Sequence, residues 1–395
     1  MVHRTDRILD NIPVGALGII SLPGCEEMGN RVNDYLVKWR KETDHEHKDN
    51  IVFSGYENET YLINAKVPRF GSGEAKGIIE ESVRGKDLYL MVDVCNYSLT
   101  YSLTGNTNHM SPDDHFQNLK RIIAAVGGKA RRLNVIMPFL YESRQHKRSA
   151  RESLDCALAL QELVRMGVDN IITFDAHDPR VQNAIPLSGF ETVRPTYQFI
   201  KGLLRSFDDL QLDSEHLMAI SPDEGATGRA IYFANVLGID MGMFYKRRDY
   251  TQVVNGRNPI VAHEFLGSSV AGKDVIILDD MISSGDSILD VAKQLKARKA
   301  RRIFAAATFG LFTNGMEKFD QAYEEGLIHG ILTTNLIYQT PELLSRPYYI
   351  NCDMSKYVAL LIDTLNHDGS ISGLLDPFDR IQAIVEAYKK GEPIE

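Results

Sequence analysis

Cysteine is scarce in this chain, and its few cysteines lie far apart. Cys25, Cys95, Cys156 and Cys352 are spread over 395 residues, and no two of them form a CxxC pair. This spacing argues against a zinc ribbon and against a disulfide-stapled scaffold. Unpaired thiols are typical of proteins that work in a reducing compartment, so the sequence predicts a cytoplasmic protein.

Long apolar runs, a leader peptide and an excess of positive charge are also missing. No stretch approaches the length of about 20 apolar residues that a membrane-spanning helix needs. The N-terminus, "MVHRTDRILDNIPVG", lacks the basic and then apolar regions of a signal peptide. The net charge of −9 offers no general electrostatic attraction to nucleic acid. We therefore expect neither a membrane nor a nucleic-acid partner.

Short β-rich runs alternate with helical patterns along most of the chain. Helical apolar spacing recurs at 151–166 and 287–299, and a charged run at 38–50 is expected to be a solvated helix end and loop. The alternation predicts an α/β fold with mainly parallel sheets. The expected strands are 17–22, 88–94, 133–139, 170–174, 241–245, 274–279 and 302–308.

The length of 395 residues allows for roughly two or three domains. The best boundary lies in "NAIPLSGFETVRPTYQ", which has two prolines and a glycine. It predicts two α/β domains, at 1–190 and 191–395.

The most informative stretch is "DVIILDDMISSGDSIL", at 274–289. Four apolar residues lead into Asp279 and Asp280, and a small polar loop precedes a helical pattern. In open α/β sheets, ligands bind beyond the carboxyl ends of the strands, and helix N-termini bind phosphate. The pattern suits a sugar phosphate, with the carboxylates on ribose hydroxyls and the loop on the phosphate. The alternative is that Ser283 or Asp286 only caps the helix.

Three further motifs carry groups suited to phosphate chemistry. "FDAHD" supplies Asp175 and His177 and "SPDEG" supplies Asp223, a set that predicts a magnesium site with oxygen and imidazole ligands. "YKRRDY" places Lys246 and Arg248 after a strand, where they would stabilise charge during phosphoryl transfer. The plainer interpretations are a hydrogen-bonded loop histidine and a solvated basic patch. No GxxxxGK[ST] occurs, so any ATP site is not of the Walker A type.

The order of these motifs resembles one family. "SVRGKDLYL", "MPFLYESRQHKRSARES", "GVDNIITFDAHDPRVQNAIP", "ISPDEGATGRA" and "YKRRD" precede the DD strand. Together they look like ribose-phosphate pyrophosphokinase, also called phosphoribosyl-pyrophosphate synthetase, from about residue 68 to about 340. The resemblance implies two similar domains of the type I phosphoribosyltransferase fold and a homo-oligomer, often a hexamer.

The resemblance also implies a reaction and the residues that serve it. The C1 hydroxyl of ribose 5-phosphate would attack the β-phosphorus of ATP, with Mg²⁺ as cofactor and AMP as the leaving product. The matching Lys and Arg lie on a mobile loop in the family, and here "TQVVNGRNP" follows them as a lid would. The implied site residues are Ser72, Glu74, Arg144 and Gln145 for ATP; Lys246 and Arg248 for catalysis; His177, Asp223 and Asp175 for Mg²⁺; and Asp279, Asp280, Ser283, Ser284, Gly285, Asp286 and Ser287 for ribose 5-phosphate.

The chain departs from the family pattern in two places. Asp286 stands in the phosphate loop where glycine is usual, and the segment 91–110 is longer than usual. Two alternatives therefore stay open. One is a phosphoribosyltransferase, which explains the DD loop but not the other motifs; the other is a catalytically weak regulatory paralogue that binds synthetase subunits.

Overall fold

The computed structural model describes residues 12–42, 55–248 and 260–394, and it divides the chain into two compact units. Unit 1 comprises the residues up to Arg194 together with 335–338 and 353–376, and unit 2 comprises the rest. None of the helices in these described ranges is long and apolar enough to cross a bilayer.

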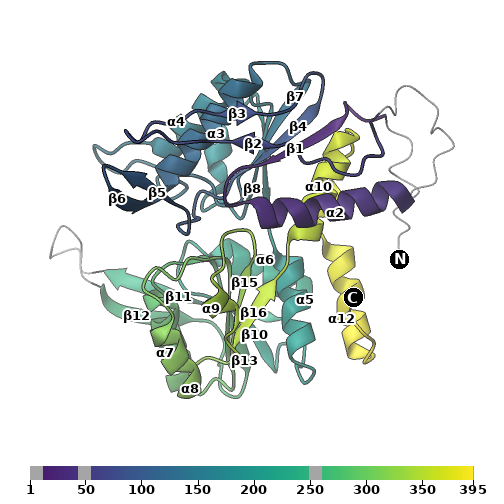
Figure 1. Cartoon of the computed structure of the whole chain (residues 1–395). Coiled ribbons are helices and arrows are strands. Elements are labelled where there is room, and N and C mark those ends of the chain that lie inside the picture. The colour runs from purple at the N-terminus through teal and green to yellow at the C-terminus, as the bar shows by residue number, and fades with distance from the viewer. Residues whose placement is uncertain (1–11, 43–54, 249–259, 395) are drawn as a thin grey trace. The chain divides into compact units, whose positions relative to one another are not determined.

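Unit 1 is built on a five-stranded parallel sheet with the order β1-β4-β7-β8-β9 (Figure 1). Two small antiparallel pairs, β2–β3 and β5–β6, accompany it. Its elements are β1 (Leu17–Ser21), α2 (Glu26–Glu42), β2 (Ala65–Lys66), β3 (Ile78–Ile79), β4 (Asp87–Met91), β5 (Thr100–Leu103), β6 (Asn106–His109), α3 (Pro112–Val126), β7 (Arg132–Ile136), α4 (Asp155–Arg165), β8 (Asn170–Phe174), the 3₁₀ helix η2 (Pro179–Ala184), β9 (Gly189–Val193), α10 (Ser355–Asn366) and α11 (Ser372–Leu375).

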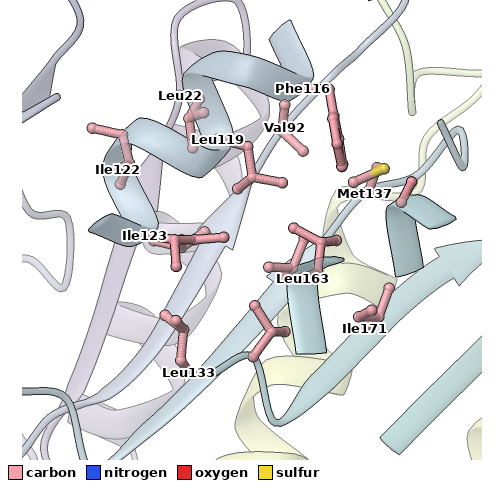
Figure 2. Close-up of a cluster of buried hydrophobic side chains, with 14 of the residues drawn as sticks. Leu22, Val92, Phe116, Leu119, Ile122, Ile123, Leu133, Met137, Leu163 and Ile171 are labelled. Atoms are coloured by element: carbon pink, nitrogen blue, oxygen red, sulfur yellow. The ribbon is translucent and has the colours of Figure 1, made fainter. Parts of the chain in front are cut away.

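One face of this sheet forms a core with α3 and α4. Alternate residues of the strands point into it, as in Leu88, Leu90 and Val92, because side chains of a strand alternate between faces. Figure 2 shows Val92, Leu133 and Ile171 on the sheet side of this core, with Leu119 and Leu163 from the two helices. Burial on both faces explains the apolar runs from which these strands were predicted.

The C-terminal part of unit 1 was not expected from the sequence, which predicted one boundary near residue 190. Helix α10 packs on α2, although more than 300 residues separate them. Arg40 of α2 is 2% exposed and donates to Asp363 and Asn366 of α10, and its guanidinium lies 4.4 Å from the ring of Tyr56. The expectation that 38–50 is solvated is therefore wrong for Arg40; residues 43–50 lie outside the described ranges.

Unit 2 is built on a seven-stranded sheet with the order β12-β11-β10-β13-β14-β15-β16, in which only the β11–β12 pair is antiparallel. Helices α7 and α8 share a core with one face, and α5, α6 and α12 share a core with the other. Its elements are α5 (Thr196–Ser206), β10 (Leu217–Ser221), α6 (Thr227–Leu237), β11 (Asp240–Arg248), β12 (Ile260–Leu266), β13 (Asp274–Ile282), α7 (Asp286–Ala297), β14 (Ile303–Gly310), α8 (Glu317–Glu324), β15 (Gly330–Thr334), α9 (Pro341–Leu344), β16 (Tyr349–Cys352) and α12 (Phe378–Lys389).

The strand order of unit 2 reverses between β10 and β13. From β10 the chain passes through α6 to β11 on one side, and it then returns to β13 on the other side. Because α6 and α7 belong to cores on opposite faces, the topology predicts a crevice between the carboxyl ends of these two strands. The fold thus creates a place for a ligand before any particular side chain is considered.

Candidate functional site

The paired carboxylates lie at this reversal of strand order. The pairing of β10 with β13 ends at Ile220 and Ile277, while β13 continues alongside β14 as far as Ile282. Asp279 and Asp280 therefore lie within the strand, not after it as the sequence suggested, but beyond its contact with β10. Asp223 follows β10 from the other side of the crevice.

Burial and mutual repulsion govern the charge of the pair. Burial, together with the neighbouring Asp280 and, less strongly, Asp223, raises the pKa of Asp279 well above its ordinary value. The guanidinium of Arg229, in α6, lies 3.9 Å from the carboxylate of Asp280. The backbone N–H of Asp280 donates to Asp279 at 2.9 Å. At Asp279, burial and repulsion thus outweigh the contacts that lower its pKa, and hydroxyl donors of a sugar would suit the pair.

The loop from Ser283 to Ser287 leads directly into α7. Gly285 is the residue before the helix, with φ of 83°, and no side chain caps the helix there. A Cβ atom at Gly285 would lie 2.2 Å from Cζ of Phe319, so the backbone conformation and the lack of space both require glycine. The interpretation of Ser283 or Asp286 as a simple cap is therefore wrong, and the first N–H groups of α7 remain suited to an anion.

Lys246 and Arg248 lie near the end of β11, the neighbour of β10. The strand is longer than expected and forms a hairpin with β12, in which Lys246 is opposite His263 and Arg248 is opposite Ile260. The two side chains fall outside the described part of the structure, as does the whole of the expected lid sequence, 251–259. The catalytic role of these residues stays a prediction.

In unit 1, the segment "RFGSGE" forms a tight exposed turn. Ser72 donates to Glu74 at 2.8 Å, and the backbone of Phe70 bonds to that of Glu74. Arg69 fastens the turn, because it donates to the Gly73 carbonyl and to Asp114 at the start of α3. The ring of Tyr101, in the β5–β6 hairpin, lies 4.0 Å from the guanidinium of Arg69. The segment 91–110 thus includes a hairpin that supports the turn.

The segment "YESRQ" is tied to the same end of α3. Tyr141 donates to Asp113, the neighbour of Asp114, at 2.6 Å. Arg144 is exposed, and the side-chain amide of Gln145 donates to the Ser153 carbonyl at 2.8 Å. Both segments expected to contact ATP are therefore anchored on the first turn of one helix.

The segment "FDAHD" joins them through a histidine that sequence reasoning had not singled out. The ring of His146, directly after Gln145, lies 5.2 Å from that of His177, and its Nε2 is 3.5 Å from Asp178. Its buried Nδ1 has no hydrogen-bond partner in the described part of the chain. Asp175 is buried at 6% exposure and has φ of 39°, an uncommon conformation for a side chain other than glycine.

The residues expected to bind magnesium do not form a complete protein site. Within the described ranges, no group of three or more His, Cys, Asp or Glu side chains could hold a metal ion alone. Asp175 and His177 lie in unit 1 and Asp223 in unit 2, where one of its carboxylate oxygens accepts the N–H of Gly225 at 2.9 Å. Carboxylate and imidazole groups can serve Mg²⁺, which is usually held by one or two carboxylates, waters and substrate phosphates rather than by an all-protein site.

Two residues of the candidate site were missed from the sequence, Arg229 and His146. The paired carboxylates did indicate that a cation should lie nearby, and Arg229 lies six residues after Asp223 in the quoted motif "ISPDEGATGRA". Arg229 lies in the first turn of α6, which begins at Thr227 directly after this loop. No comparable signal pointed to His146, whose contact with Asp178 depends on the fold.

Comparison with known proteins identifies the family. The model for the N-terminal domain of ribose phosphate pyrophosphokinase matches residues 17–167, and that for the phosphoribosyl synthetase-associated domain matches 252–376. The ribose-phosphate pyrophosphokinase of Vibrio parahaemolyticus is 28% identical over 319 residues, which cover 80% of this chain and 92% of that protein. That of Mycoplasma genitalium is 28% identical over 272 residues, covering 68% and 74%.

The fold has a solved counterpart over nearly its whole length. The phosphoribosylpyrophosphate synthetase from Mycobacterium smegmatis superposes with a TM-score of 0.70 at 20% identity, covering 89% of this chain and 99% of that one. This likeness confirms the expected fold class. With the two family models and the curated relatives, it shows that the chain belongs to the ribose-phosphate pyrophosphokinase family.

Proposed function

We propose that this protein is a ribose-phosphate diphosphokinase. The oxygen of the C1 hydroxyl of ribose 5-phosphate forms a bond to the β-phosphorus of ATP, and the bond from that phosphorus to the α,β-bridging oxygen breaks. The hydroxyl proton is released, and the products are phosphoribosyl pyrophosphate and AMP. One observation carries the proposal: the sugar-phosphate loop coexists with three N-terminal segments that assemble around the first turn of α3 and His177.

Ribose 5-phosphate is assigned to unit 2. Asp279 and Asp280 accept hydrogen bonds from the ribose hydroxyls; their place on β13 beyond its pairing with β10, and the raised pKa of Asp279, support this assignment. The 5-phosphate binds the N–H groups and hydroxyls of the loop, where Ser283, Ser284, Gly285, Asp286 and Ser287 lead into α7.

ATP is assigned to unit 1, through Ser72, Glu74, Arg144 and Gln145. The positions of Asp113 and Asp114 on α3 support this assignment, since they fasten both segments to one helix end. Mg²⁺ would be held by His177 and Asp223, with Asp175 as a weaker candidate, together with phosphate oxygens. When bound, the ion neutralises charge on the phosphates.

Lys246 and Arg248 stabilise the transferring group in this proposal. Phosphoryl transfer needs little covalent help from a protein, so positioned positive charge provides most of the catalysis. Their place on β11, beside β10 and its Asp223, supports this role.

The assembly and the compartment are also proposals. The family resemblance suggests a homo-oligomer, often a hexamer. The four cysteines form no disulfide, and all are described as free thiols, which suits the cytoplasm. Neither the phosphoribosyltransferase nor the regulatory paralogue gains support, because the matches extend over both parts of the synthetase.

The decisive experiment follows phosphorus NMR of the purified protein with ATP, Mg²⁺ and ribose 5-phosphate. We expect AMP and phosphoribosyl pyrophosphate to appear together, and only when the sugar phosphate is present. Lys246→Ala should reduce turnover by about 10³-fold while the circular dichroism spectrum stays unchanged. If a folded wild-type protein forms neither product, the proposal is wrong; near-normal turnover of the variant would remove only the role of Lys246.

A further inference from the structure

The phosphate loop contains an acidic residue where an anion is expected to bind. Asp286 is the first residue of α7 and is exposed. The N-terminus of a helix attracts anions, but a carboxylate at this place repels a phosphate and competes with it for the same N–H groups. A loop that binds ribose 5-phosphate must therefore neutralise or displace this charge.

The carboxylate of Asp286 is held by two neighbours. Lys318, in α8, donates from Nζ to one oxygen at 2.5 Å, and the hydroxyl of Ser284 donates to the other at 3.0 Å. The bond from Lys318 is the largest cause that keeps the pKa of Asp286 below its ordinary value. Both side chains of the ion pair are about half exposed. The pair lines a surface groove of about 300 Å³ beside α7 and α8.

Helix α8 is fixed relative to the loop by a second contact. Phe319, next to Lys318, is 1% exposed and lies against Gly285, where its ring occupies the space that a side chain would need. Its ring also meets that of Phe312 edge to face, at 5.3 Å. Helices α7 and α8 contribute to the same core. The backbone of Lys318 is thus held at a constant position from which its side chain reaches Asp286.

We propose that Lys318 is a positioning residue for sugar-phosphate binding, which neutralises Asp286 and holds its carboxylate toward α8, leaving the N–H groups of the loop to the 5-phosphate of ribose 5-phosphate. This inference rests on the proposed function, because it names a further residue of the same site. Lys318 itself is not assigned a contact with the substrate. Its effect is exerted through Asp286, so it depends on that residue being charged.

The competing interpretation is an ordinary surface ion pair. Exposed pairs contribute little to stability. Under that interpretation, loss of Lys318 lowers the melting temperature slightly and leaves substrate affinity unchanged. Under ours, the uncovered charge of Asp286 weakens the binding of a dianion, and removing Asp286 as well cancels the loss.

The experiment is a double-mutant cycle on the full chain, with Lys318→Met, Asp286→Asn and the combined variant. For Lys318→Met we expect KM for ribose 5-phosphate to rise about tenfold, with kcat and KM for ATP within twofold of wild type. In the combined variant, KM for ribose 5-phosphate should return to the value of Asp286→Asn. Lys318→Arg should retain the wild-type KM, since it keeps the charge.

Lys293→Met is the matched control. Lys293 faces the same groove and its loss changes the net charge equally, but it acts on Asp286 only through space and more weakly than Lys318, which forms the ion pair. We expect less than a twofold change in KM. An unchanged KM in Lys318→Met, or an equal rise in the combined variant, overturns the inference while product formation by the wild type still stands.

Titration calorimetry with ribose 5-phosphate separates this inference from the proposed function. If the wild type binds the sugar phosphate but makes no product, the proposed function fails, and the same cycle is judged on Kd. A tenfold weaker Kd in Lys318→Met that recovers in the combined variant then supports the inference. If the wild type does not bind ribose 5-phosphate at all, the inference is overturned as well.

Discussion

Strand β13 carries aspartates near both ends, and their surroundings shift the carboxyl pKa in opposite directions. Asp274, at its start, is 1% exposed and receives hydrogen bonds from both Arg301 and Arg302. Asp279 and Asp280, near its end, are instead two adjacent carboxylates. Burial would raise the pKa of Asp274, but the bonds from Arg301 and Arg302 outweigh it and hold that pKa below its ordinary value. For Asp279, burial and Asp280 act together and raise the pKa well above it.

The carboxylates at the two ends of β13 therefore differ in whether the protein or a ligand supplies their partners. At the start of β13, the protein supplies all the positive charge, so the carboxylate serves the fold. At its end, two adjacent carboxylates lie together, with Asp280 buried and Asp279 half-buried, and the guanidinium of Arg229 is 3.9 Å from Asp280. Carboxyl groups whose pKa is raised by burial and by a neighbouring carboxylate gather at functional sites. The difference indicates which end binds a ligand.

Strand β4 of unit 1 shows a related contrast. Asp87, at its start, is fully buried and accepts hydrogen bonds from Arg132, Asn134 and Asn366. Asp93, just beyond its end, accepts only backbone N–H groups, from Cys95 and Tyr338. In both sheets, the aspartate at the strand start accepts hydrogen bonds from arginine. The aspartates nearer the carboxyl edge, Asp93 and Asp279, have a raised pKa instead.

The largest effect is expected for Asp274→Asn, which tests whether the start of β13 serves stability rather than binding. The substitution keeps the volume but removes the charge that pairs with Arg301 and Arg302, so we expect the free energy of unfolding to fall by about 3 kcal/mol. The KM values of the remaining folded enzyme should change little, because the residue lies at the opposite end of the strand from the site. Urea unfolding and steady-state kinetics measure the two quantities. A large change in KM with unaltered stability would contradict the division of roles.

Asp279→Asn should give the opposite result. We expect kcat/KM for ribose 5-phosphate to fall about 100-fold, since one partner of the ribose hydroxyls is lost. Because the raised pKa of Asp279 favours its neutral form in the fold, its ionisation lowers stability as pH rises, and the neutral amide should be at least as stable as wild type at pH 8. Thermal unfolding at that pH measures this. The control is Asp290→Asn, at an exposed position in α7, which should alter neither kcat/KM nor thermal stability. If Asp279→Asn is less stable than the wild type and fully active, our interpretation of Asp279 is wrong.

Much of the fold and of unit 2's site could be predicted because their signals are local in sequence. The apolar run, the two aspartates and the small loop at 274–289 carry their own chemistry, and the structure places them at one crevice. The burial of Arg40 could not be predicted, because its partner Asp363 lies 323 residues away. For the same reason the assignment of α10 to unit 1 was missed. Lys318 escaped notice because Asp286 meets it only through the packing of α8 on α7.

The smallest expected effect concerns Asp93, which has burial in common with Asp279 but no proposed ligand. Burial raises its pKa to about 7, against the lowering effect of its two N–H donors. Its stabilising contribution is therefore greatest in acid and is lost as pH rises toward 7, by about 1 kcal/mol per pH unit. Asp93→Asn should remove this slope from the free energy of unfolding between pH 5 and 7, whatever constant loss the missing hydrogen bond causes. If the free energy of unfolding changes with pH equally in the variant and the wild type, Asp93 is ionised throughout this range. Burial at the carboxyl edge of a sheet would then not be enough to raise a carboxyl pKa, and the raised pKa of Asp279 would need another cause.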